Sequence, residues 1–378
     1  MSHSPLRVLQ INTDFKKGGV QAEIMYPARI LSKDRVNFDV MLLTDTVGFY
    51  EDEFSNYGEI YRIPLKKKAT RIARIISVFT EYFQLKKEMI LFLKSHKAYD
   101  AVHCHNLRYN APCMAAAKKC DVPVRIAYCA VNKPERGEYK DRLYYRLYLK
   151  LCSFVLNRCC THQFGVTQNA ADYAFGKGKG KPIKNPTVDF EMFDPDKYPK
   201  AIDGKIHLLM VGSYSSRKNQ KFAVDVLNEL VKKNADADLT FVGYPRSPKE
   251  TYLPELQDKV REYSLNEKVT YLPQDANIPE VMSRSTYLLI PSLQEGLPNV
   301  ALEAQKMGLP CFLSTDVSND CDCGICTFLP LDNGAEYWAK EIIEHTKKHG
   351  LEKQYVDMSE WDNRKVCEMY MDIWSGKC

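Results

Sequence analysis

Short apolar runs alternate with longer stretches of mixed polar and apolar residues along almost the whole chain. The short runs are typical of buried strands, and the longer stretches show the spacing of amphipathic helices. The expected strands are 6–11, 37–43, 59–63, 99–104, 122–128, 161–166, one that ends at residue 212, 238–243, 268–275 and two within 286–314. This alternation predicts an α/β protein with doubly wound parallel sheets. Because the chain has 378 residues, we expect two domains rather than a single core.

The segment 286–314, TYLLIPSLQEGLPNVALEAQKMGLPCFLS, carries the clearest local signals. It predicts a strand, a loop, a short helix and a second strand, with Pro298 in the first helical turn and Gly308 at the helix end. Glu295 precedes this helix and Glu303 lies inside it. Since the unpaired N–H groups at a helix start attract negative charge, the segment predicts a site for an anionic ligand.

Glu295 and Glu303 form an E-x7-E pattern, and EGLPNVALEAQKMGLPCFLS resembles the donor-site segment of retaining GT-B glycosyltransferases. The resemblance is to the GT4 family, specifically its EpsF-like polysaccharide biosynthesis type, and it covers nearly the whole chain. It implies a GT-B fold, in which two Rossmann-like doubly wound α/β domains have a cleft between them. The implied parts are an acceptor-side domain at 1–190, a linker at 191–204, a nucleotide-sugar-binding domain at 205–350 and a C-terminal helix within 351–378 that packs back on the first domain. The boundary rests on Asn185, Asp189 and Phe193, because IKNPTVDFEMF resembles the family segment that leads into the linker.

The resemblance also assigns the donor site. It implies that Glu303 accepts hydrogen bonds from the ribose hydroxyls, that Glu295 lies against the donor sugar, and that Lys218 neutralises charge on the leaving group. The other residues it assigns to donor binding are Gly18, Gly19, Arg217, Leu272, Pro273, Gly296, Leu297, Pro298, Asn299 and Val300. For Gly18 and Gly19 a second explanation stays open, a turn that needs positive φ.

On the acceptor side, DAVHCHN resembles a family element that leads into the acceptor cleft, and it implies that His105 orients an acceptor hydroxyl. His105 thus joins Glu295 and Lys218 as a candidate catalytic residue. The chain departs from the family at RIAYCAVN, where Ala130 replaces a histidine, and at Ser213, which replaces an arginine. These departures leave transfer itself open to test.

The function implied is retaining transfer of a sugar, in hexosyltransferase fashion, from a nucleotide sugar, expected to be a UDP-sugar. The acceptor is a glycan or a lipid-linked glycan in surface polysaccharide biosynthesis. No metal and no cofactor is expected, because the nucleotide sugar is a substrate. Two alternatives stay open: a catalytically weak or inactive GT-B subunit that binds nucleotide sugar or a partner transferase, and a GT-B nucleotide-sugar epimerase.

The composition of the chain narrows its possible location and its possible partners. There is no apolar run long enough to span a membrane and no signal-peptide pattern at the start, so we expect a cytoplasmic protein. The thirteen cysteines are therefore expected to be reduced, and Cys321, Cys323 and Cys326 lack the paired spacing of a zinc site. A net charge of +5 is too small for this length to indicate nucleic acid as a partner.

Two expected helices, 66–97 and 138–160, combine basic residues with apolar and aromatic ones. One interpretation is that each packs one face on its own domain and exposes its charges. The other is peripheral contact with an anionic membrane, which would place the protein on the inner face of the membrane. The sequence leaves both open.

Overall fold

The structure is a computed structural model that describes residues 4–16, 18–65, 71–131, 143–198, 203–245 and 251–377. Parts of three expected segments, residues 66–70, 138–142 and 199–202, lie outside the described residues. The chain divides into two compact units. Unit 1 comprises Met1–Thr187 and Glu360–Cys378, and unit 2 comprises Val188–Ser359. The expected linker at 191–204 therefore falls within unit 2, and the last segment of the chain within unit 1.

Unit 1 contains, among its described residues, a sheet of seven parallel strands in the order β3-β2-β1-β4-β5-β6-β7. The strands are β1 (Leu6–Asn12), β2 (Val36–Leu42), β3 (Ile60–Arg62), β4 (Ala101–Cys104), β5 (Val124–Cys129), β6 (His162–Gly165) and β7 (Lys181–Pro182). The helices are α1 (Gly19–Ile30), α2 (Glu51–Phe54), α3 (Arg71–Ser95), α4 (Asn110–Lys119), α5 (Leu143–Cys159), α6 (Gln168–Phe175) and α12 (Asn363–Trp374).

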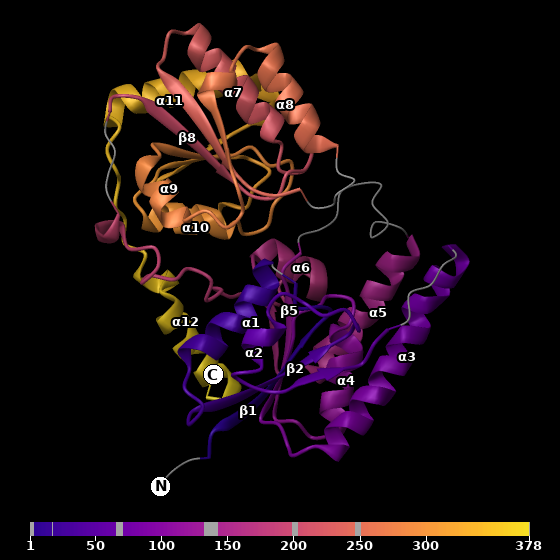
Figure 1. Cartoon of the computed structure of the whole chain (residues 1–378). Helices are drawn as coiled ribbons and strands as arrows, with labels where there is room; N and C mark the ends of the chain where they lie inside the picture. Colours follow the sequence, from indigo (N-terminus) through magenta and orange to yellow (C-terminus); the bar gives the residue numbers. More distant parts are fainter. Residues whose placement is uncertain are drawn as a thin grey trace. The chain divides into compact units, whose positions relative to one another are not determined.

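Helices cover both faces of the unit 1 sheet, which explains why its central strands are almost continuously apolar. Figure 1 shows α1 and α12 on one face and α3, α4 and α5 on the other, and α12 packs directly against α1. All four residues of β4 are buried, including the polar His103. The buried rings of Tyr370 and Trp374 on α12 complete this core.

Unit 2 contains a second sheet, of six parallel strands in the described residues, in the order β10-β9-β8-β11-β12-β13. The strands are β8 (Ile206–Val211), β9 (Ala237–Val242), β10 (Val269–Leu272), β11 (Tyr287–Ile290), β12 (Cys311–Ser314) and β13 (Cys326–Leu329). The helices are α7 (Gln220–Lys232), α8 (Tyr252–Glu262), α9 (Ile278–Arg284), α10 (Asn299–Lys306) and α11 (Gly334–His349). Short 3-10 helices are η2 (Pro195–Lys197), η3 (Asn266–Lys268), η4 (Asn319–Cys321) and η5 (Leu331–Asn333), while η6 (Ser359–Trp361) begins at the last residue of unit 2 and ends in unit 1.

The unit 2 sheet is also covered on both faces. Figure 1 shows α7, α8 and α11 on one face and α9 and α10 on the other. The core between the sheet and the first group includes Leu208, Phe241, Leu256 and the fully buried Trp338. The expected α/β architecture with two doubly wound domains is therefore confirmed.

The strand order fixes where a ligand can bind. In unit 1 the first strand β1 lies between β2 and β4, and in unit 2 the first strand β8 lies between β9 and β11. Chain connections leave the sheet in opposite directions on the two sides of such a strand, and ligands of doubly wound folds bind beyond the carboxyl ends of the strands there. This rule selects the loops after β8 and β11 in unit 2, and the loops after β1 and β4 in unit 1.

Candidate active site

The loop after β8 depends on two glycines. Gly212 has φ +146°, which disfavours other residues, and a Cβ atom built on it would lie 3.5 Å from Cε of Lys218. Gly243, just after β9, approaches so closely that its Cβ would lie 2.3 Å from the carbonyl oxygen of Gly212. The backbone conformation of Gly212 and the close approach of Gly243 to its carbonyl therefore fix the start of this loop, and the Lys218 side chain lies in van der Waals range of Gly212.

The loops after β8 and β11 meet in an ion pair between Lys218 and Glu295, as their shared assignment to the donor site predicts. The Lys218 ammonium donates a hydrogen bond to Oε1 of Glu295 at 2.5 Å, and the side chains are 14% and 15% exposed. Oγ of Ser292 donates to Oε2 of the same carboxylate at 3.0 Å. Since an ammonium has three N–H donors and only one points to Glu295 in the described residues, the others can bind an anion.

Backbone and hydroxyl contacts hold this pair in place. The N–H of Leu293 donates to the carbonyl of Arg217 at 2.9 Å, which joins the two loops. The fully buried Ser314, at the end of β12, donates from Oγ to the Ser292 carbonyl at 2.6 Å. Glu295 also pairs with Val317 in an isolated parallel bridge. The Lys218–Glu295 pair is therefore held by the ends of three neighbouring strands, β8, β11 and β12, rather than by one loop.

Glu303 lies one turn inside α10 and differs from Glu295 in having no hydrogen-bond or ion-pair partner for its carboxylate among the described residues. Burial raises the pKa of Glu303 from its ordinary value of 4.5 to about 7. A partly buried carboxylate without donors is well suited to accept hydrogen bonds from ligand hydroxyls, because such bonds stabilise its charged form.

The start of α10 lies between these two carboxylates. Pro298 occupies the N-cap, with extended backbone and no capping hydrogen bond from its side chain, and the helix begins at Asn299. Pro298 therefore lies one residue before the helix rather than in its first turn, where it was expected. Gly296 and Leu297 connect Glu295 to the cap, and Val300 is in the first turn. The first N–H groups of α10 consequently lack intrahelical partners, as the sequence predicted for an anion site.

The expected base-binding residues lie at the end of β10. Leu272 is its last residue, and Pro273 is exposed just beyond it. Leu272 also lines a cavity of about 510 Å³ that runs along the sheet to residues near the strand starts, among them His207 and Asp238. Leu272 is therefore the only one of the donor-site residues assigned from the sequence that contributes to this cavity.

In unit 1 the structure corrects one explanation for the glycine pair after β1. Gly18 is the N-cap of α1 with φ −176°, an extended conformation that any residue adopts, and Gly19 is the first helical residue. Positive φ is therefore not the reason for this pair. A Cβ on Gly18 would instead lie 2.6 Å from Oε1 of the flexible Gln21 side chain.

His105 follows β4 and belongs to a buried polar cluster, formed by Gln10, Glu23, His105, Tyr128 and Asn185. Nε2 of His105 lies 2.7 Å from Oε1 of Gln10, and its Nδ1 lies 3.8 Å from Oε2 of Glu23. Asn185 donates to Glu23 at 2.6 Å, and the Tyr128 hydroxyl lies within hydrogen-bond distance of both. Burial raises the pKa of Glu23, although the nearby His105 ring and the hydrogen bond from the Tyr128 hydroxyl oppose the rise. His105 is only 7% exposed, so its Nε2 could contact an acceptor substrate only if the Gln10 side chain moved away from it.

Gln10 and Glu23 were missed by the sequence reasoning, although each carries a signal. Gln10 is a polar residue between the apolar Leu9 and Ile11 of its strand, and Glu23 is an acidic residue among the buried positions of α1. Tyr128 fills the core beside His105, with ring centroids 5.5 Å apart. Ala130, where the family resemblance expects a histidine, follows the end of β5 and has no polar side chain.

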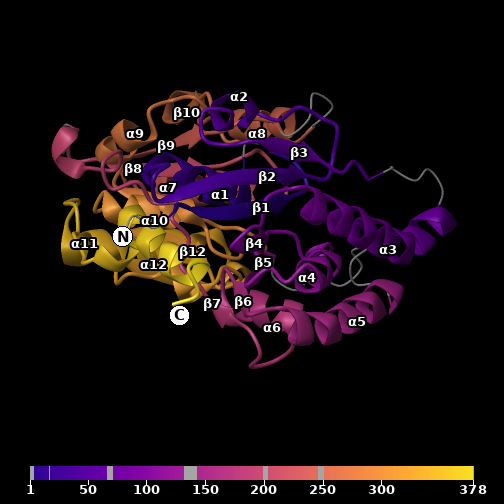
Figure 2. The ribbon, with the colours of Figure 1, turned by 90° about the horizontal axis from the view of Figure 1, so that it is seen from below.

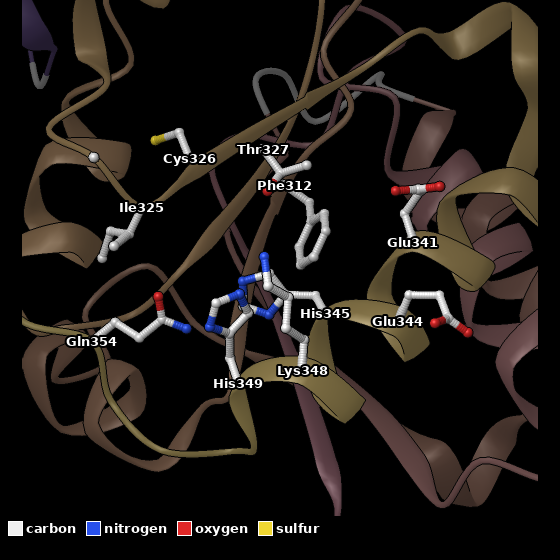
Figure 3. Close-up of a pocket in the computed structure, with 11 residues that line it drawn as sticks. Phe312, Ile325, Cys326, Thr327, Glu341, Glu344, His345, Lys348, His349 and Gln354 are labelled. Atoms are coloured by element: carbon white, nitrogen blue, oxygen red, sulfur yellow. The ribbon is translucent and has the colours of Figure 1, made fainter.

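A second cavity of unit 2, of about 470 Å³, lies between β12, β13 and α11 and contains none of the predicted site residues. Figure 3 shows the rings of His345 and His349 side by side, with centroids 4.6 Å apart, near Lys348. Burial lowers the pKa of His345, and repulsion from the nearby His349 and Lys348 lowers it further. Cys326 lines this cavity, but within the described ranges no group of three or more His, Cys, Asp or Glu side chains could hold a metal ion.

The chain is similar in sequence to known glycosyltransferases. Residues 205–347 match the family described as "Glycosyl transferases group 1". The chain is 24% identical over 372 residues to EpsF of Bacillus subtilis, named a glycosyltransferase, which covers 94% of this chain and 92% of that protein. It is 23% identical over 340 residues to the UDP-Gal:alpha-D-GlcNAc-diphosphoundecaprenol alpha-1,3-galactosyltransferase of Escherichia coli, covering 85% and 82%.

Among solved structures, that of Anabaena HepE in complex with UDP is similar to this chain with a TM-score of 0.68, at 15% identity and with 98% of both chains covered. A likeness at this identity shows the fold. The expected GT-B fold and the resemblance drawn from the sequence are both confirmed.

Proposed function

Since the chain resembles GT4-type glycosyltransferases of the EpsF kind, we propose that it transfers a sugar from a UDP-sugar to a glycan or lipid-linked glycan, with retention at the anomeric carbon. The Lys218–Glu295 pair is the observation that carries this proposal, because it holds an ammonium at the end of β8, where a diphosphate would lie. Two relatives support the choice of donor and acceptor. The galactosyltransferase is named for UDP-Gal and a diphosphoundecaprenol-linked acceptor, and HepE was crystallised with UDP. The pathway we infer is surface polysaccharide biosynthesis.

Each part of the donor would meet one part of the unit 2 site. Glu303 accepts hydrogen bonds from the ribose hydroxyls, and the unpaired N–H groups at the start of α10 face the diphosphate. Lys218 and the exposed Arg217 add positive charge, while Glu295 contacts the sugar. No metal and no cofactor is part of this proposal, because Lys218 supplies the charge that stabilises the leaving group.

The chemistry follows from what the Glu295 carboxylate already does. Lys218 and Ser292 both hold it, so it positions the ammonium rather than attacking the anomeric carbon. In the reaction we propose, the bond from the anomeric carbon to the diphosphate oxygen breaks and a bond to the acceptor oxygen forms on the same face of the sugar. The acceptor proton passes to the departing diphosphate. Lys218 is expected to contribute most in the transition state, where charge on that oxygen is largest.

A coupled assay of UDP release tests the proposal on the whole chain, with a panel of UDP-sugars and of free and lipid-linked glycan acceptors. We expect turnover with one donor and a fall of about 10² to 10³ in kcat for Lys218→Met, the usual loss when one charge-stabilising donor is removed. The matched control is Lys221→Met, which removes a lysine three residues further on that pairs with Glu255 at 2.6 Å. Lys218→Met turnover equal to that of the control would contradict the role of Lys218.

A second candidate function is a GT-B subunit that binds nucleotide sugar without turnover. Two observations favour it: Ala130 offers no polar group beyond β5, and Ser213 replaces the family arginine in the loop after β8. The same assay separates the candidates, since donor binding without UDP release over the whole panel would favour the subunit. NMR of the donor without acceptor would reveal an epimerase instead.

Contact with an anionic membrane from the cytoplasmic side is also part of the proposed function.

A further inference from the structure

The exposed face of α5 carries a continuous row of large apolar side chains. Leu143, Leu147, Leu151 and Phe154 are each between 51% and 71% exposed. Their spacing of four, four and three residues places them on one side of the helix. A surface helix normally presents polar residues there, so a row of this kind indicates a surface that binds something.

The opposite face of α5 already has its partners. Tyr145, Tyr148, Leu149, Cys152 and Leu156 are buried, and the Tyr148 hydroxyl donates to the carbonyl of Arg108 at 2.8 Å. These contacts fix the helix on unit 1 without any help from the exposed row. The exposed leucines are therefore not required for the fold, and substitutions there test binding rather than folding.

All charges on α5 are positive. Arg146, Lys150 and Arg158 are exposed, and the sequence of the helix contains no aspartate or glutamate. The guanidinium carbon of Arg158 lies 3.6 Å from the centroid of the Phe154 ring. The cations therefore stand among the apolar side chains rather than on a separate face.

The neighbouring helix α3 extends the same surface. Figures 1 and 2 both show α3 and α5 on the same side of unit 1, and Phe79 of α3 packs edge-on against Tyr148 of α5 at 5.8 Å. Phe83 and Leu91 of α3 are 69% and 59% exposed. The exposed Lys87 lies between them in sequence. Both helices therefore present exposed apolar and basic side chains on this side of unit 1, and we call these residues of the two helices the α3–α5 face.

We propose that the α3–α5 face docks on an anionic phospholipid bilayer, with α5 in the plane of the headgroups, which gives the membrane contact of the proposed function a defined location. In that position the leucines and Phe154 enter the acyl boundary, and lysine and arginine reach the lipid phosphates. No described helix has the length and apolar character needed to cross the bilayer.

The charge on this face selects the lipid over other occupants. A protein interface pairs opposite charges, whereas α5 offers only cations. A symmetric contact between two copies would set cations against cations. An anionic lipid surface satisfies both the apolar row and the charge.

Co-sedimentation of the whole chain with vesicles tests this surface. We expect binding to phosphatidylcholine vesicles that contain phosphatidylglycerol, weak binding to phosphatidylcholine alone, and loss of binding as salt rises. Lys150→Glu with Arg158→Glu should lower the partition coefficient by at least about 25-fold, at about fivefold per cation removed. Leu147→Ser with Leu151→Ser should lower it by about tenfold or more.

Two matched controls lie outside the α3–α5 face. Val47→Ser removes an apolar side chain that is 73% exposed in unit 1, and Lys340→Glu reverses an exposed lysine on α11. Both should sediment with vesicles as the unchanged chain does. Equal binding to the two vesicle types, or unchanged binding of the α5 variants, would overturn the proposal.

Two further measurements separate this proposal from its alternatives. A dimer in the absence of lipid, abolished by Leu147→Ser with Leu151→Ser, would show that the face binds a second copy and would overturn the lipid assignment. UDP-induced thermal stabilisation should be the same in all α5 variants, because their folded donor site is intact. Since the vesicles carry no glycan, loss of sedimentation and loss of sugar transfer are scored independently.

Discussion

Glu303, whose carboxylate has no partner among the described residues, gives the proposed donor site a pH dependence that follows from its raised pKa. Its pKa of about 7 means that the carboxylate is about one-tenth ionised at pH 6 and about nine-tenths ionised at pH 8. Ribose hydroxyls donate to the charged form, so binding lowers this pKa and favours the deprotonated protein. Nucleotide affinity should therefore rise as pH rises towards 7 and level off above it, by about tenfold between pH 6 and pH 8.

Isothermal calorimetry with uridine or a UDP-sugar measures this effect. These ligands are preferable to UDP, whose terminal phosphate titrates near pH 6 and would add its own slope. Glu303→Gln keeps the size of the side chain but cannot ionise, so its affinity should be lower at pH 8 and independent of pH. Titrations in buffers of different ionisation enthalpy should show proton release at pH 6.5 for the unchanged chain only. An affinity independent of pH in the unchanged chain, or an equal slope in Glu303→Gln, would refute the ribose role.

The same group makes an opposite prediction for stability. A carboxyl whose folded pKa exceeds its unfolded value binds more protons in the folded state, so its contribution to stability falls as pH rises from 4.5 to about 7. That difference corresponds to at most about 3 kcal/mol, and residual solvent contact reduces it. Chemical unfolding at pH 8 should therefore show Glu303→Gln to be more stable than the unchanged chain, although it binds nucleotide less well.

Three further predictions concern unit 2. Glu295→Gln should reduce kcat more than UDP affinity, because the neutral amide holds Lys218 less firmly. Ser292→Ala should also reduce kcat more than UDP affinity, but should raise the activation free energy by only about 1 kcal/mol. Equal losses in kcat and in UDP affinity would argue against this positioning of Lys218. Partial burial lowers the pKa of His207, but the hydrogen bonds and charges of Asp238 and Asp203 outweigh it and raise the pKa. The ion pairs of His207 therefore contribute about 1 kcal/mol to folding stability below the unfolded pKa, and this contribution is lost as pH rises through the raised folded pKa. The free energy of unfolding of His207→Gln, compared with the unchanged chain at pH 6 and pH 9, measures the contribution, and an equal difference at both pH values would contradict it. Gly212→Ala should destabilise by about 1 to 3 kcal/mol and weaken UDP binding, whereas Gly204→Ala, also at positive φ, should destabilise without changing UDP affinity.

The α/β fold could be read from the sequence because its central strands are apolar along their length and are separated by amphipathic helices. The failures occurred where that contrast is weak. β13 was missed because Cys326–Leu329 follows a run of cysteine, aspartate and glycine that is typical of a loop, and β7 because it has two residues, one of them proline. Their strand identity depends on pairing with β12 and β6, which a local pattern does not contain.

That Lys218 and Glu295 of the proposed donor site lie together was predictable for a related reason. Glu295 and Glu303 lie close together in the sequence, so one motif contains both, and Lys218 lies in the corresponding loop after β8. The buried polar cluster of unit 1 is different, because its contacts join residues far apart in sequence. Glu23 meets Asn185 across 162 positions, and His105 meets Gln10 across 95. Local patterns can mark such residues as unusual but cannot pair them.

The position of α12 has a consequence for synthesis of the chain. Tyr370 stacks on His103 with ring centroids 5.8 Å apart, and Trp374 packs edge-on against Phe38 at 5.3 Å, so the end of the sequence fills part of a core that the start of the sequence begins. Unit 1 therefore cannot close while the ribosome is still making unit 2. Until α12 is released, a nascent chain exposes the apolar surface around Phe38 and His103, and chaperones have the whole translation time of unit 2 in which to bind it.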